Sequence, residues 1–175
     1  ELLKASLFKN EPNIPAETDW NNVFEIARNQ ALVALAEYSV PDRLRSSWKT
    51  ETSLSKKHYI VSLYEQDKIL QVFQEHSIPT AILKGTSAAM YYPVPSCRSM
   101  GDIDILVSVE RYEDAKKILQ EVGYQFKKED YRNSTFTKNK IVVELHYHFS
   151  AEEKDIELLM SEGLRNAVQY KIDSY

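Results

Sequence analysis

The spacing of apolar residues changes at Pro79, and this change restricts the chain to a fold with helices first and strands second. Residues 1–77 contain no glycine, and their apolar side chains recur at the three- and four-residue intervals of helices. After Pro79 the apolar residues come in short runs separated by polar turns, which is typical of strands. Because the two patterns occupy separate stretches and do not alternate, the sequence predicts an α+β fold.

Three helices are expected before Pro79. Thr18 or Asp19 can cap a helix that starts at Trp20, and an Ala/Leu-rich helix is expected over 31–38. A longer amphipathic helix is expected over about 53–76. Its apolar stripe contains Ile60, Leu63, Tyr64, Leu70 and Phe73.

Five strands and one helix are expected next. The expected strands are residues 80–83, 103–107, 124–128, 134–138 and 141–148. A helical stripe over 109–122 ends at Gly123, a residue suited to the position after a helix. We therefore expect a helical subdomain at 1–78, a strand-rich core at 79–150 and a C-terminal helical segment at 151–175.

Composition excludes several classes of protein. Among 175 residues, 22 are Lys or Arg and 26 are Asp or Glu, so a broad basic surface for nucleic acid is not expected. Cys97 is the only cysteine, which excludes an internal disulfide and suits a reducing compartment such as the cytoplasm. No apolar run approaches the roughly 20 residues of a membrane span, and no signal peptide is expected.

Two acids interrupt the most apolar of the expected strands. Asp102 and Asp104 alternate with Ile103 and Ile105, although Asp is one of the residues least suited to a strand. Alternation places both carboxylates on one face, about 6–7 Å apart. Two charges at that separation repel by roughly 2–3 kcal/mol at an effective dielectric constant near 20. A divalent cation would remove this repulsion, and Mg²⁺ is the natural candidate.

The strand expected at 141–148 contains a third acid. Glu144 shares one face with Val142, His146 and His148. If this strand lies beside the Asp-x-Asp strand, Glu144 completes an oxygen-rich site of three carboxylates. Alternatively, Glu144, His146 and His148 form a transition-metal site, or His146 contacts the substrate.

The segment from Lys84 to Ser87 is a candidate phosphate-binding turn. It follows the first expected strand and opens a helix, so the backbone N–H groups of Gly85, Thr86 and Ser87 could face an anion. The segment is not a Walker A motif, because its lysine precedes its single glycine. Arg98 adds a positive charge shortly before Asp102, and the alternative for Arg98 is a surface ion pair.

These motifs together resemble a known family. Leu83-Lys84-Gly85, Tyr92-Pro93, the run Arg98–Val107 and Glu144-Leu145-His146 are similar to the uncharacterised nucleotidyltransferase family of the DNA polymerase beta superfamily. The resemblance implies a small mixed sheet flanked by helices and preceded by a helical region. It also implies transfer of a nucleoside monophosphate from an NTP, with ATP expected, to an acceptor hydroxyl.

The resemblance also implies roles for individual residues. Asp102, Asp104 and Glu144 would be catalytic and would bind two Mg²⁺ ions, and Glu144 would help to deprotonate the acceptor. Lys84, Gly85, Thr86, Ser87 and Arg98 would bind phosphates. The interval from Gly85 to Asp102 is longer than is usual in the superfamily.

Two other functions remain open at the level of sequence. One is a nucleotide-binding or regulatory module that keeps the fold without turnover. The other is a phosphotransferase that moves the γ-phosphate, because a similar site can serve kinase chemistry. The sequence does not identify the acceptor, which could be a protein, a sugar, a small molecule or an RNA end.

Overall fold

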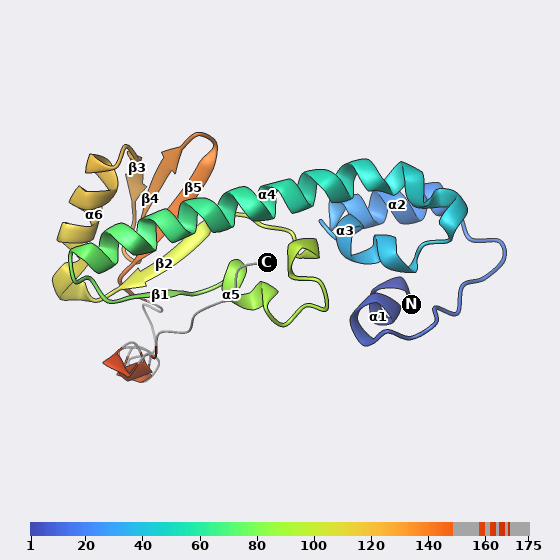
Figure 1. The fold of residues 1–175 in the computed structure, drawn as a ribbon, viewed down its shortest axis with the longest axis horizontal. Coiled ribbons are helices and arrows are strands. Elements are labelled where there is room, and N and C mark those ends of the chain that lie inside the picture. The colour runs from blue at the N-terminus through green and yellow to red at the C-terminus, as the bar shows by residue number, and fades with distance from the viewer. Residues whose placement is uncertain (149–157, 160–161, 164, 167, 169–175) are drawn as a thin grey trace. The chain divides into compact units, whose positions relative to one another are not determined.

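The computed structural model describes residues 1–148 and residues 158, 159, 162, 163, 165, 166 and 168. Within these residues the chain forms two compact units, one of residues 1–65 and 85–101 and the other of residues 66–84 and 102–175. Helices come first and strands second, so the expected α+β class is confirmed (Figure 1). The division into 1–78, 79–150 and 151–175 stays a prediction, and most of the last segment lies outside the described residues.

The described elements follow one another along the chain in this order: α1 Leu2–Phe8, α2 Trp20–Asn29, α3 Val33–Ala36, η1 Glu37–Ser39, α4 Asp42–Glu75, β1 Thr80–Ile82, α5 Thr86–Ala89, η2 Pro95–Cys97, β2 Ile103–Val107, η3 Val109–Arg111, α6 Tyr112–Glu121, β3 Gln125–Glu129, β4 Asn133–Lys138 and β5 Ile141–His146.

The first unit is helical. Asp19 caps α2 as predicted, because its carboxylate accepts the backbone N–H groups of Asn21 and Asn22 at 3.1 and 3.2 Å. Trp48 is buried beside Phe24 in an edge-to-face contact with ring centroids 5.2 Å apart. The predicted Ala/Leu-rich helix is shorter than expected, because a 3₁₀ turn follows α3.

The long helix α4 differs from the prediction in its start and in its buried face. It begins at Asp42, directly after Pro41, and proline is favourable at the start of a helix. Ile60 and Tyr64, expected on the buried stripe, are exposed, whereas Ser62 and Gln66 are buried. Hydropathy alone misplaced these two residues because polar residues occupy buried positions of this helix, whereas Phe73 of the same stripe is fully buried as expected.

The second unit contains a five-stranded sheet with the order β1-β2-β5-β4-β3. β2 and β5 are parallel, and every other neighbouring pair is antiparallel, so the sheet is mixed, as the resemblance implied. The strands expected from sequence agree with the observed ones to within a few residues at their ends. The parallel pair β2–β5 forms the centre of the sheet.

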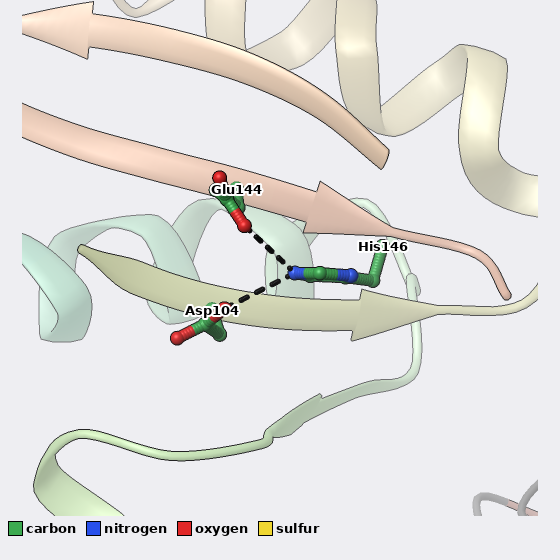
Figure 2. Close-up of side chains that lie close together, drawn as sticks. All are labelled: Asp104, Glu144 and His146. Atoms are coloured by element: carbon green, nitrogen blue, oxygen red, sulfur yellow. Dashed lines mark hydrogen bonds and ion pairs between the residues drawn. The ribbon is translucent and has the colours of Figure 1, made fainter. Parts of the chain in front are cut away.

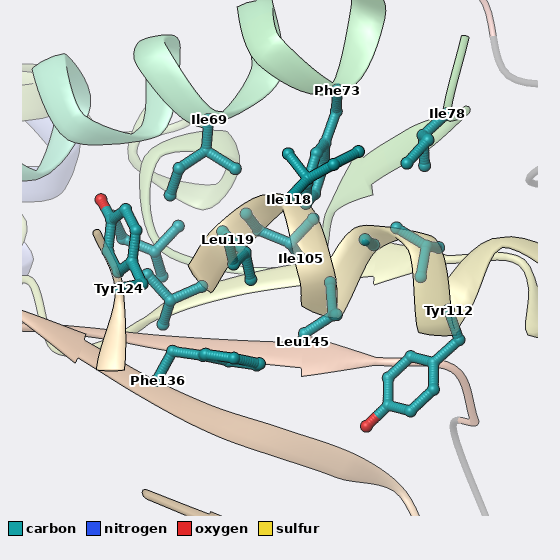
Figure 3. Packing of buried hydrophobic residues seen from close by; sticks show 14 of the residues in the cluster. Ile69, Phe73, Ile78, Ile105, Tyr112, Ile118, Leu119, Tyr124, Phe136 and Leu145 are labelled. Carbon is teal, nitrogen blue, oxygen red and sulfur yellow. The ribbon is translucent and has the colours of Figure 1, made fainter. Parts of the chain in front are cut away.

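Two helices cover one face of this sheet. Ile69 and Phe73 of α4 and Leu119 of α6 pack against Ile105 and Leu145 of the central strands (Figure 3). Because side chains alternate along a strand, the even-numbered residues of β2 and β5 point to the opposite face. These residues include Asp104, Glu144 and His146. Because the odd-numbered residues are held in the core, the register of the acidic face is fixed.

No helix in the described part of the chain combines the length and the hydropathy that a bilayer crossing requires.

Candidate active site

Asp104 is a buried acidic residue of the second unit. It is the second residue of β2, and only 2% of its surface is exposed. Its Oδ1 accepts hydrogen bonds from Lys84 Nζ at 2.9 Å and His146 Nε2 at 3.1 Å. Burial raises the pKa of Asp104, but these hydrogen bonds and the charges of their donors outweigh burial and hold the pKa below its ordinary value. The carboxylate is therefore ionised at neutral pH despite its burial.

Glu144 lies directly beside Asp104. The parallel register of β2 and β5 pairs the two residues, so the adjacency that the sequence interpretation required is confirmed. His146, two residues further along β5, brings Nε2 to 3.4 Å from Glu144 Oε2 as well as to Asp104 (Figure 2). One imidazole nitrogen thus bridges two carboxylates from neighbouring strands.

These three side chains can share a ligand. One donor atom from each of Asp104, Glu144 and His146 lies within 4.8 Å of the other two. The second oxygens of the two carboxylates, Oδ2 and Oε1, take no part in the contacts with His146 (Figure 2). Carboxylate oxygens are the ligands that Mg²⁺ and Mn²⁺ prefer, and an imidazole favours Mn²⁺ or later transition metals. The donor set therefore fits a divalent cation.

Asp102 precedes β2 and does not belong to this three-residue group. Its charge nevertheless acts on Lys84. The pKa of Lys84 is raised first by the hydrogen bond to Asp104, and the charges of Asp104, Asp102 and Glu144 add to this effect. The charges of all three predicted carboxylates thus raise the pKa of Lys84, although only Asp104 and Glu144 belong to the group that contains His146.

The predicted phosphate-binding turn is divided between the two units. Lys84 belongs to the second unit, and Gly85, Thr86 and Ser87 belong to the first. Gly85 has φ 61° and ψ −115°, a conformation that suits glycine, and the four-residue helix α5 starts at Thr86. The expected strand–turn–helix order is therefore observed. Thr86 is buried, and Ser87 is the more accessible of the two hydroxyl residues.

Arg98 also belongs to the first unit. Its Nη1 donates to the carbonyl oxygen of Ser99 at 3.2 Å and approaches Met100 Sδ at 3.8 Å. These contacts join it to the segment that leads into Asp102.

The structure supports only two of the three ligands expected for the alternative transition-metal site, which were Glu144, His146 and His148. Among the described residues, the group that can share a metal contains Glu144 and His146 but has Asp104 in the position that the sequence interpretation gave to His148. His148 contacts the ring of Tyr147, with centroids 4.4 Å apart.

Asn133 was missed at the sequence level. It is paired with His146 across β4 and β5, and its Nδ2 donates to Glu144 Oε2 at 2.9 Å. Asn is poorly suited to strands, and this mismatch was the available signal. Asn133 could be assigned to the site only once β4 was known to lie beside β5.

The chain is similar to two solved structures and to one protein family. No curated protein matches the chain. A crystal structure of ANT(2″)-Ia in complex with adenylyl-2″-tobramycin is similar at 20% identity over 53% of each chain, with a TM-score of 0.44. A solution structure of the antibiotic-resistance factor ANT(2″)-Ia is similar at 21% identity, with a TM-score of 0.40, over 50% of this chain and 46% of that one.

The alignment thus spans about half the length of these two structures. The decisive match is to the family described as uncharacterised nucleotidyltransferase, which covers residues 16–175. The family expected from the motifs is confirmed. The chain belongs to the uncharacterised nucleotidyltransferase family.

Proposed function

We propose that this protein is a nucleotidyltransferase that depends on a divalent cation and moves a nucleoside monophosphate from an NTP to an acceptor hydroxyl. The observation that carries the proposal is the pairing of Asp104 with Glu144 on parallel strands, with His146 Nε2 3.1 and 3.4 Å from their oxygens. Two carboxylates are brought together on a face where the fold gains no apolar burial from them. A divalent cation bound by both carboxylates would offset their mutual repulsion.

The proposed ligands of the cation are Asp102, Asp104 and Glu144, with Mg²⁺ as the first ion to test and two ions expected. In the present structure Lys84 and His146 supply the donors that balance the buried carboxylate of Asp104. A cation bound there would lower the pKa of the acceptor hydroxyl and balance charge on the phosphates.

The proposed transfer is an in-line displacement. The acceptor oxygen forms a bond to the α-phosphorus, and Glu144 accepts the hydroxyl proton. The bond from the α-phosphorus to the oxygen that bridges to the β-phosphorus breaks, and its electron pair leaves with pyrophosphate. Lys84, whose side chain is 62% exposed, releases Asp104 and pairs with the phosphates.

The remaining assignments are also proposals. Gly85, Thr86, Ser87 and Arg98 bind the triphosphate, and His146 contacts the substrate. ATP is the first NTP to test, and a protein, a sugar, a small molecule or an RNA end is the acceptor. The proposed location is the cytoplasm, in keeping with the single, buried cysteine.

Product analysis tests the proposed function. The protein is incubated with Mg²⁺ or Mn²⁺, α-labelled NTPs and a panel of acceptors. Labelled acceptor together with pyrophosphate supports nucleotidyl transfer, and both products should disappear in Asp104→Asn. Release of ADP with a phosphorylated acceptor would identify a phosphotransferase. Tight binding of NTP without turnover of any acceptor would favour a binding module.

A further inference from the structure

Thr135 has a buried hydroxyl group without a hydrogen-bond partner on the proposed catalytic face. It lies in the middle of β4, is 8% exposed, and is the direct cross-strand partner of Glu144. Directly paired residues of antiparallel strands point to the same face, with Cβ atoms about 4.5–5.5 Å apart. The hydroxyl is therefore next to the Glu144 side chain, and leaving it unpaired costs free energy.

The neighbouring residue shows that β4 can satisfy a buried hydroxyl. Ser134 faces the helix-covered side, and its Oγ accepts a hydrogen bond from the Tyr112 hydroxyl at 2.6 Å. Thr52 and Ser62 are the other buried hydroxyls without a partner among the described residues, and both lie on α4. A helical Ser or Thr can turn toward the carbonyl four residues earlier, whereas the carbonyl groups of a central strand serve the sheet.

The Glu144 carboxylate can use a second donor. Its contacts with Asn133 and His146 both go to Oε2. A cation held between Asp104 and Glu144 competes with His146 for the same carboxylates. If Glu144 moved away from His146 to bind the cation, its carboxylate would lose one of these contacts. Thr135 is the direct cross-strand partner of Glu144, and its hydroxyl is a donor that could replace that contact.

We infer that Thr135 is a positioning residue for Glu144, and this inference rests on the proposed function. Its hydroxyl donates to the Glu144 carboxylate when a divalent cation occupies the site, and thereby fixes the orientation in which Glu144 binds that cation. This role accounts for a buried hydroxyl that has no hydrogen-bond partner beside Glu144. Valine has nearly the same shape as threonine and suits a strand, so shape alone gives no reason for a hydroxyl here.

The test compares Thr135→Val with Thr135→Ser in the full chain. Mn²⁺ is the probe, and its binding is measured by electron paramagnetic resonance without nucleotide or acceptor. The thermal unfolding midpoint is measured without metal. Thr135→Val should weaken Mn²⁺ binding about three- to tenfold, the effect of one hydrogen bond, and should keep or raise the midpoint because an unpaired hydroxyl is removed. Thr135→Ser should bind Mn²⁺ about as well as the wild type.

Glu144→Gln distinguishes failure of the inference from failure of the proposed function. If Glu144→Gln loses Mn²⁺ binding while Thr135→Val retains wild-type affinity, the role of Thr135 is wrong and the proposed metal site stands. A lower midpoint in Thr135→Val, with Ser restoring stability, would show a structural hydrogen bond and would also overturn the inference. If Glu144→Gln binds Mn²⁺ like the wild type, the proposed site itself is wrong.

Discussion

The two faces of the five-stranded sheet are formed by the same strands but differ in the kind of side chain that they bury. On the face covered by α4 and α6, buried side chains such as Ile105, Leu145 and Phe136 are apolar, and the hydroxyl of Ser134 is paired with Tyr112. On the other face, Asp104 is buried with its charge and Thr135 has an unpaired hydroxyl. The first face buries groups that are apolar or hydrogen-bonded, which stabilises the fold. The second face buries a charge and an unpaired hydroxyl, and such exceptions are expected at functional sites.

The comparison predicts that the first face determines stability and the second determines activity. Four substitutions test this separation. They are ordered by the free energy that each is expected to change.

The largest effect is expected for Phe136→Ala. Phe136 is fully buried in the core, so the cavity should lower the free energy of unfolding by about 3–5 kcal/mol. Urea unfolding gives this value. Phe126 is the matched control, because it is the cross-strand partner of Phe136 but is 42% exposed. Phe126→Ala should cost less than half as much, and equal losses would show that burial does not set the cost of removing a ring from this face.

The next effect is expected for Asp104→Asn. Turnover should fall at least about 100-fold, the effect of removing a major electrostatic stabiliser, or about 2.7 kcal/mol. Initial rates of pyrophosphate release measure this change. Asp42→Asn is the control, because the Asp42 side chain is 90% exposed and pairs with Arg45 on the same helix. A near-normal rate in Asp104→Asn would remove the basis for assigning function to the polar face.

A smaller effect is expected for Tyr112 at high pH. Burial raises the pKa of its hydroxyl to about 12 in the folded protein, from about 10 in the unfolded chain. As the pH rises from 10 to 12, the unfolded chain loses the phenolic proton and the folded protein keeps it, so stability should fall by about 2 kcal/mol.

Unfolding experiments at several pH values, with Tyr112→Phe as the comparison, isolate this contribution. The difference between the two proteins should stay constant below pH 10 and should shrink above it. An unchanged difference up to pH 12 would mean that the Tyr112 hydroxyl is not buried in the way described.

The smallest effect is expected for the stability of Lys84→Met. The Lys84 amine pairs with Asp104 but its side chain is 62% exposed, so solvent screens the interaction. The free energy of unfolding should change by about 1 kcal/mol or less, as measured by urea unfolding. A loss of stability as large as that of Phe136→Ala would show that the polar face also stabilises the fold. It would contradict the prediction that stability is determined by the helix-covered face.

Sequence reasoning succeeded where local patterns carry the information. Alternation in the Asp102–Val107 run put Asp104 opposite the core residues Ile103 and Ile105, as observed. It failed for part of α4, because the buried positions include Ser62 and Gln66, and helical periodicity alone favoured Ile60 and Tyr64. It could not assign Asn133, since a polar residue in a strand has many explanations until its neighbour is known.

The sequence by itself determined the order of helices and strands, the face on which Asp104 and Glu144 lie and the family of the chain. Those properties follow from residue spacing, which the backbone geometry of helices and strands converts directly into direction. Only the tertiary structure decided that β5 lies parallel to β2 with Glu144 beside Asp104, and that β4 places Asn133 and Thr135 beside Glu144. Strand order and register depend on how the whole core packs under α4 and α6, and no short stretch of sequence contains that information.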